Sequence, residues 1–114
     1  MGLGDSILGK KPEYWYVGEL RKLFVKRLDA ERYISNIREV ERVRGPDDDF
    51  VRKNTPAVEK TKIRVSEIEE QIESLVDDMK KYGYKLPVNA ITDIRNNHSS
   101  IKPSIMVKIL AVGS

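Results

Sequence analysis

Apolar residues recur at helical spacing through a first long stretch of the chain, residues 13–44. They fall at intervals of three, four and seven, and Leu, Glu, Arg and Lys, which favour helices, dominate between them. The members of this stripe are Val17, Leu20, Leu23, Phe24, Leu28, Ala30, Tyr33, Ile37 and Val40. The pattern predicts a helix from about Glu13 to Arg44, which Gly45-Pro46 ends.

A second stretch carries the most regular pattern in the sequence. Its apolar positions alternate steps of three and four, as in a heptad seam, with one polar member. The seam consists of Val58, Thr61, Val65, Ile68, Ile72, Leu75, Met79 and Tyr82. It predicts a helix over 56–82, with Thr55 as its N-cap, Pro56 at the first helical position and Gly83 as its stop. Residues 47–55 are then a polar connection.

The last thirty residues are less regular. Val88, Ile91 and Ile94 predict a short helix after Leu86-Pro87 that ends near Arg95, and residues 96–100 are typical of a turn. The apolar run in 101–112 suits a helix entered at Pro103. It is also rich enough in β-branched residues for a strand, and both alternatives stay open.

Two amphipathic helices of similar length, joined by a short connection, can bury their stripes against each other. Residues 10–44 hold ten basic and six acidic side chains, and residues 56–82 hold five basic and seven acidic ones, so their charges are complementary. We therefore predict a mainly α fold in one domain: a flexible leader (1–12), a long antiparallel, coiled-coil-like hairpin (13–82) and a C-terminal capping segment (83–114). The alternatives are a seam that pairs between chains, or a hairpin side that another protein covers.

Composition refines this picture. Of the 114 residues 34% are charged, against about 25% in ordinary domains, which favours an elongated shape. Cysteine is absent, which excludes disulfides and thiolate chemistry and favours an intracellular setting, in the cytoplasm or within a virus particle. No apolar run is long enough to span a membrane, and the net charge of +3 is mild.

Three short motifs suggest chemistry that their surroundings do not support. Met1-Gly2 with Ser6 matches the N-myristoylation pattern, and Lys10 and Lys11 would add a weak membrane signal. A glycine-rich leader is the favoured interpretation, so we expect membrane contact only if Gly2 is acylated. The acidic run 47–49 lacks the alternating ligands of a calcium loop and is interpreted as a solvated linker.

The third motif is His98 with Ser100, which has no nucleophile elbow or oxyanion loop around it, so we interpret His98 as a turn residue. The sequence also lacks a phosphate-binding glycine loop, a metal-binding histidine pair and a dinucleotide fingerprint. We therefore expect no cofactor, no metal and no enzymatic activity.

Two binding functions remain. The leading hypothesis is a non-catalytic protein-interaction or assembly module that binds a protein partner or self-associates. Its candidate contacts are Tyr14, Trp15, Tyr16, Ile105, Met106 and Ile109. The alternative is nucleic-acid binding through the basic first helix, with Arg21, Lys22, Lys26, Arg27, Arg32 and Arg38 as candidate contacts. Acidic residues alternate with these basic ones, which is more typical of a solvated helix face.

Overall fold

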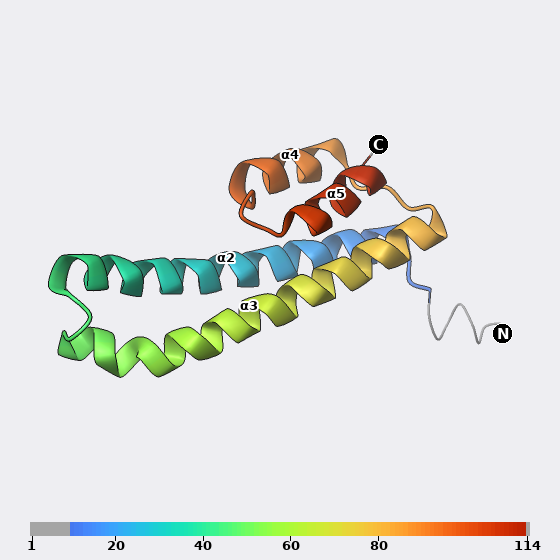
Figure 1. Ribbon diagram of the computed structural model, residues 1–114. Coiled ribbons are helices and arrows are strands. Elements are labelled where there is room, and N and C mark those ends of the chain that lie inside the picture. Colours follow the sequence, from blue (N-terminus) through green and yellow to red (C-terminus); the bar gives the residue numbers. More distant parts are fainter. Residues whose placement is uncertain (1–9, 114) are drawn as a thin grey trace.

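The computed structural model describes residues 10–113 (Figure 1). This part of the chain forms four helices and no strand: α2 (Glu13–Arg44), α3 (Asp49–Tyr82), α4 (Val88–Asn97) and α5 (Pro103–Val112). Helices α2 and α3 are antiparallel and pack along each other, which confirms the predicted helical hairpin. The molecule is elongated, with extents of 59 × 29 × 19 Å.

The beginning of α3 differs from the prediction. The helix starts at Asp49 rather than Pro56, so most of the expected linker is helical. Asp48 is the N-cap, because its Oδ1 accepts hydrogen bonds from the backbone N–H groups of Phe50 (3.0 Å) and Val51 (3.3 Å). Val51 is 3% exposed, so its burial anchors this first turn to the hairpin.

Thr55 and Pro56 consequently lie inside the helix. Thr55 is not an N-cap: its Oγ1 donates a hydrogen bond to the carbonyl of Val51, one turn earlier. Pro56 has no N–H to donate to the carbonyl of Arg52, so α3 lacks one backbone hydrogen bond there. The Asp48 cap and the buried Val51 outweigh the start signal that Thr55-Pro56 carries.

Two glycines shape the ends of the long helices. Gly45, with φ +92°, follows α2, and Gly83, with φ +74°, follows α3. Both angles lie in the region that side chains disfavour, so a glycine at each position relieves strain. After Gly83 the N–H of Tyr84 donates to the carbonyl of Met79 at 2.8 Å, which completes a C-terminal cap and turns the chain toward α4.

Helices α4 and α5 cover only one end of the hairpin, where α2 begins and α3 ends (Figure 1). α5 is a helix, which decides between the two alternatives for residues 101–112. Lys108 of α5 reaches across to α3, with its Nζ 2.8 Å from Glu73 Oε2 and 3.2 Å from Asp77 Oδ1. The hydrogen bond with Glu73, and to a smaller extent the one with Asp77, raises the pKa of Lys108 above its ordinary value.

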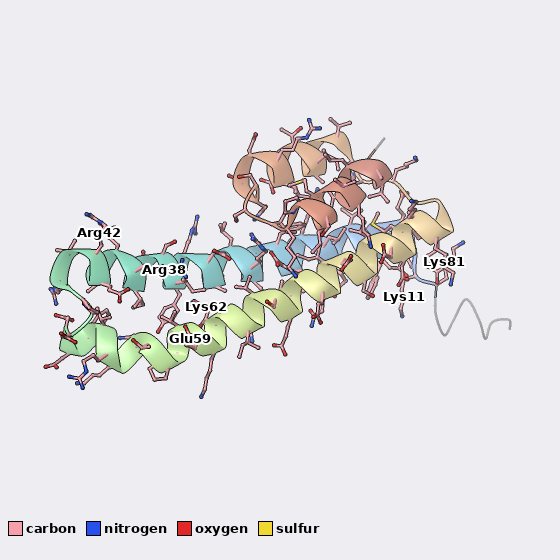
Figure 2. All side chains as sticks on the ribbon, viewed as in Figure 1. Lys11, Arg38, Arg42, Glu59, Lys62 and Lys81 are labelled. Carbon is pink, nitrogen blue, oxygen red and sulfur yellow. The ribbon has the colours of Figure 1, made fainter. Side chains whose placement is uncertain are left out.

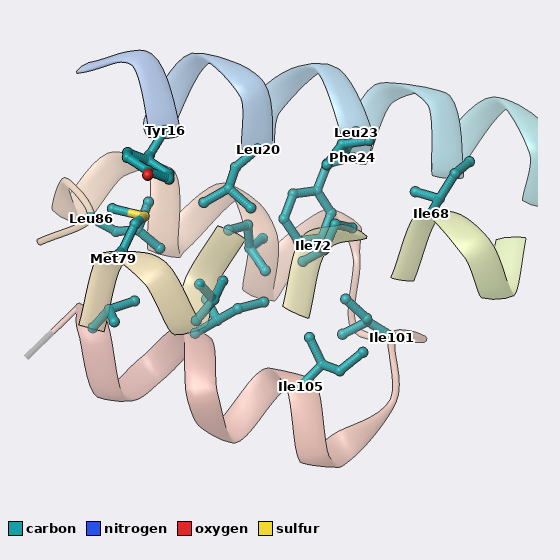
Figure 3. Packing of buried hydrophobic residues seen from close by; sticks show 14 residues of the cluster. Tyr16, Leu20, Leu23, Phe24, Ile68, Ile72, Met79, Leu86, Ile101 and Ile105 are labelled. Atoms are coloured by element: carbon teal, nitrogen blue, oxygen red, sulfur yellow. The ribbon is translucent and has the colours of Figure 1, made fainter. Parts of the chain in front are cut away.

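The covered end holds the main hydrophobic core, in which side chains from α2, α3 and the C-terminal segment meet (Figure 3). Its buried members are Tyr16, Leu20, Leu23, Phe24, Ile68, Ile72, Val76, Met79, Leu86, Ile94, Ile101, Ile105, Ile109 and Val112. Beyond that end the hairpin continues as two helices alone. We call residues 30–65 the arm; its smaller core consists of Ala30, Ile34, Ile37, Val58 and Val65.

The seam of α3 lies along α2, but its burial is uneven. Val58, Val65, Ile68, Ile72 and Met79 are buried, whereas Thr61, Leu75 and Tyr82 are partly buried. Val76, which the seam does not include, is 1% exposed. It is buried because α3 packs against α5 as well as α2, so its apolar face is wider than a two-helix seam.

Candidate functional site

The aromatic run at the start of α2 divides between surface and core. Tyr14 is 78% exposed and Trp15 is 37% exposed, but Tyr16 is 2% exposed. Burial, and after it the negative charge of Asp78, raise the pKa of the Tyr16 hydroxyl. Three consecutive helical residues point in different directions, so Tyr14 and Trp15 remain accessible to a partner and Tyr16 stabilises the core.

The candidate contacts on α5 divide in the same way. Ile105 and Ile109 are 2% and 0% exposed and pack in the main core, and Met106 is partly buried beside them. Ile105 and Ile109 are therefore not available as a contact surface in this structure. Their apolar run, which the sequence leaves free for a partner, is used to cover the end of the hairpin.

Arg27 was predicted to be a candidate nucleic-acid contact, and the structure shows that this prediction is wrong. Its side chain is 2% exposed, its Nε donates to Glu69 Oε2 at 3.0 Å and its Nη2 donates to Ser100 Oγ at 3.1 Å. A buried guanidinium requires such partners because it has lost its water. Arg27 thus links α2, α3 and the segment between α4 and α5, and it cannot reach a phosphate.

The sequence did contain a signal for this ion pair. Arg27 follows Leu20 by seven residues and Phe24 by three, so it lies on the apolar stripe of its helix. Glu69 follows Val65 by four residues and precedes Ile72 by three, so it lies directly beside the seam of α3. Opposite charges on two facing stripes indicate a buried pair more specifically than either residue does alone.

The other candidate nucleic-acid contacts, Arg21, Lys22, Lys26, Arg32 and Arg38, are exposed. Lys22 Nζ is 3.1 Å from Glu19 Oε2 on the same helix, and Glu39 pairs with Arg42 further along. Because acidic side chains pair with basic ones along α2, the positive charge of this helix is interrupted. This leaves short basic patches rather than a continuous track for a phosphate backbone.

His98, in the middle of the predicted turn (96–100), is the C-cap of α4, and its side chain is buried, at 4% exposure. Its ring lies 4.7 Å from the Phe24 ring, and its Nε2 is 4.0 Å from Asp93 Oδ2, beyond hydrogen-bond distance. Its Nδ1 has no hydrogen-bond partner among the described residues. Burial lowers the pKa of His98. The negative charge of Asp93 acts in the opposite direction, and the positive charge of Arg27 lowers the pKa further.

Ser100 does not form a catalytic pair with this histidine. Its hydroxyl oxygen accepts the hydrogen bond from Arg27, and within residues 10–113 no hydrogen bond joins it to His98. A nucleophilic serine needs its proton directed at a base. The arrangement is therefore that of a structural contact, in which Ser100 stabilises the buried guanidinium.

A cavity of about 330 Å³ opens between α2 and α4. Apolar side chains form most of its wall; they are Val17, Leu20, Phe24, Val25, Leu86, Ala90 and Ile94. The polar groups around it belong to Arg21, Asn89, Asp93 and His98. Its volume is at the small end of ligand pockets, and the lining includes no serine, threonine or lysine that could act as a nucleophile.

Metal binding and membrane insertion find no support among the described residues. Residues 10–113 contain no group of three or more His, Asp or Glu side chains placed to hold a metal ion. Asp48, from the acidic run, caps α3 instead. None of the described helices is both long and apolar enough to cross a bilayer. Gly2 and its acylation motif lie outside the described residues.

No protein-family model matches the chain, and no curated protein or solved structure matches it significantly.

Proposed function

We propose that the protein is a non-catalytic assembly module, whose arm packs against the arm of a second copy of the chain. The observation that carries this proposal is that, within residues 10–113, no third layer covers residues 30–65. Helices α4 and α5 pack at the other end of the hairpin (Figure 1). Two helices alone enclose a thin core, and such pairs commonly become stable by adding further helices.

The composition of the arm fits a helical partner. Its inner core consists of one alanine, two isoleucines and two valines, which is a small apolar volume for so long a hairpin. Three large apolar side chains on the arm face solvent: Val43 is 67%, Phe50 47% and Ile63 62% exposed. Their burial in a four-helix arrangement would add apolar area that the single chain does not bury.

The charge of the arm favours a second copy over a strongly charged partner. Residues 30–65 hold nine basic and seven acidic side chains, which gives a net charge of +2. Basic and acidic residues also alternate in ion pairs along each helix, such as Arg42 with Glu39 and Lys62 with Glu59 (labelled in Figure 2, except Glu39). A surface that carries both signs can pair with itself in an antiparallel arrangement without net repulsion.

The test is the molar mass of the full chain by light scattering during size-exclusion chromatography. We expect a dimer of twice the 13.1 kDa chain mass. The variant Phe50→Asp/Ile63→Asp should be monomeric with unchanged helical circular dichroism, because both side chains are exposed within one chain. A charge introduced into an apolar interface is costly unless it is paired.

The matched control is Val88→Asp/Val107→Asp, which adds the same charges at exposed positions on α4 and α5, away from the arm. It should remain dimeric. A monomeric native protein at 100 µM, or equal dissociation of the arm variant and the control, would contradict the proposal.

A further inference from the structure

Lysines gather at the end of the hairpin opposite to the arm. Lys10 and Lys11 precede α2, Lys80 and Lys81 form the last turn of α3, and Lys85 follows shortly after (Lys11 and Lys81 in Figure 2). Within residues 10–16 and 80–85 five lysines accompany one acidic residue, Glu13, and Asp78 lies just before them on α3, near Tyr16. The Glu13 carboxylate is itself occupied, because its Oε2 accepts the backbone N–H of Lys85 at 2.8 Å.

Hydrogen bonds hold the two lysine-bearing segments together. The Tyr84 hydroxyl donates to the carbonyl of Lys11 at 2.8 Å, and the contact between Glu13 and Lys85 joins the same segments. Residues that lie about seventy positions apart in the sequence therefore form one surface. We call this surface the lysine–aromatic end; it consists of Lys10, Lys11, Tyr14, Trp15, Lys80, Lys81, Tyr82, Tyr84 and Lys85.

Aromatic rings lie directly under these ammonium groups. Lys10 Nζ is 5.3 Å from the Tyr82 ring centroid and 5.5 Å from that of Tyr84. Lys11 Nζ is 5.8 Å from the Trp15 ring, and Lys81 Nζ is 5.7 Å from the Tyr82 ring. Tyr82 and Tyr84 are partly buried, so they serve as a fixed platform.

Trp15 and Tyr14 complete the surface with accessible rings. Trp15 is held edge-on against Tyr16, with centroids 5.0 Å apart, while 37% of its surface remains exposed. Tyr14 is 78% exposed. The core of this protein does not require exposed aromatic side chains beside a cluster of lysines.

We infer that the lysine–aromatic end binds single-stranded nucleic acid. Lysine ammonium groups attract phosphates as point charges, and exposed aromatic faces stack on bases that are free of a duplex. A double helix would hide the base faces and leave Trp15 and Tyr14 without a role. The site differs from the predicted basic stripe of α2, and it lies away from the arm, so assembly through the arm leaves it accessible.

Trp15 is the only tryptophan, so its fluorescence reports on this site directly. We expect a twenty-residue oligothymidylate to quench Trp15 fluorescence of the full chain to saturation, because a stacked base contacts the ring. Each neutralised phosphate contributes about 0.7 to the salt slope for a single strand. Four to five contacts then predict a loss of affinity of about 50- to 130-fold between 50 and 200 mM salt.

The decisive variant is Lys10→Glu/Lys81→Glu, and the matched control is Arg95→Glu/Lys102→Glu, which changes the net charge equally at exposed positions outside both the arm and the lysine–aromatic end. Fluorescence anisotropy of a labelled oligothymidylate should show at least a tenfold weaker complex for the first variant. Binding by the control should change less than threefold. Circular dichroism checks that both variants remain helical.

Four results would overturn the inference. The first is that the oligonucleotide causes neither quenching nor an anisotropy change at 50 mM salt, and the second is that the two variants lose binding equally. The third is that polyphosphate binds as tightly as the oligonucleotide. The fourth is that phosphatidylserine vesicles, and not the oligonucleotide, change the Trp15 fluorescence. The third would reduce the site to charge without stacking. The fourth would assign it to a membrane surface.

Discussion

Removing Glu69 tests the buried ion pair that joins three parts of the fold. In Glu69→Ala, Arg27 stays at a site where its side chain is 2% exposed, without the carboxylate that accepts its Nε hydrogen bond at 3.0 Å. Breaking one side of a buried pair costs about 3–5 kcal/mol, because the remaining charge is neither hydrated nor paired. Whole domains are stable by only about 5–15 kcal/mol.

The local structure decides where in that range the loss falls. Ser100 Oγ still accepts a hydrogen bond from Arg27, and Glu31 Oε1 lies 3.9 Å from Arg27 Nη2. Glu31 is more than a third exposed, so water screens its charge and it replaces Glu69 only in part. We therefore expect a loss of about 3 kcal/mol for Glu69→Ala.

The assay is urea unfolding followed by helical circular dichroism, with the double variant Arg27→Met/Glu69→Leu as the control. The double variant should lie within about 1 kcal/mol of the native protein, since apolar side chains of similar volume replace the pair without leaving a charge. A loss below about 1 kcal/mol for Glu69→Ala would refute the reasoning, because Arg27 would then have found water or another partner.

Two further predictions concern His98 and Pro56. Burial lowers the pKa of His98 below its ordinary 6.5, so as pH falls from about 6.5 the unfolded chain takes up a proton that the folded chain resists. The free energy of unfolding should therefore decrease from pH 7 to pH 5. In His98→Asn the free energy of unfolding should decrease less over the same pH range. An equal decrease in the variant and the native protein would show that carboxylates, and not His98, cause the pH dependence. Pro56→Ala should raise the free energy of unfolding by about 2 kcal/mol in the same urea assay, because it restores the missing hydrogen bond inside α3; no gain would mean that the helix already accommodates the ring.

Periodicity predicted the long helices well because it reflects burial on one face. The bounds of α2 follow from the apolar stripe and from Gly45, both of which are local features. The start of α3 could not be predicted in the same way. Thr55-Pro56 is a strong local signal, but the Asp48 cap acts together with the burial of Val51 against the rest of the fold, and that burial is a tertiary effect.

The candidate site was harder to predict, since accessibility depends on how the C-terminal segment packs. The sequence shows that Ile105 and Ile109 are apolar, but it does not show that they pack in the main core. Likewise, the lysine–aromatic end joins residues 10–15 with 80–85, and no local pattern connects these segments. The Arg27–Glu69 pair was missed, because Arg27 was interpreted as a nucleic-acid contact, although the positions of both residues on facing helix sides could have indicated the pairing.

The central claim is that α3 lies antiparallel along α2 of the same chain. It can be measured by double electron–electron resonance between spin labels at positions 14 and 81, which are exposed and lie at the same end of the hairpin, where α2 begins and α3 ends. The chain has no native cysteine, so Tyr14→Cys/Lys81→Cys labels only these sites, and dilution with unlabelled protein isolates pairs within one chain. Packed helices lie 8–10 Å apart, so a closed hairpin predicts a label distance below roughly 30 Å. Two helices that extend end to end would separate the labels by roughly 100 Å, and a distance in that range would contradict the account.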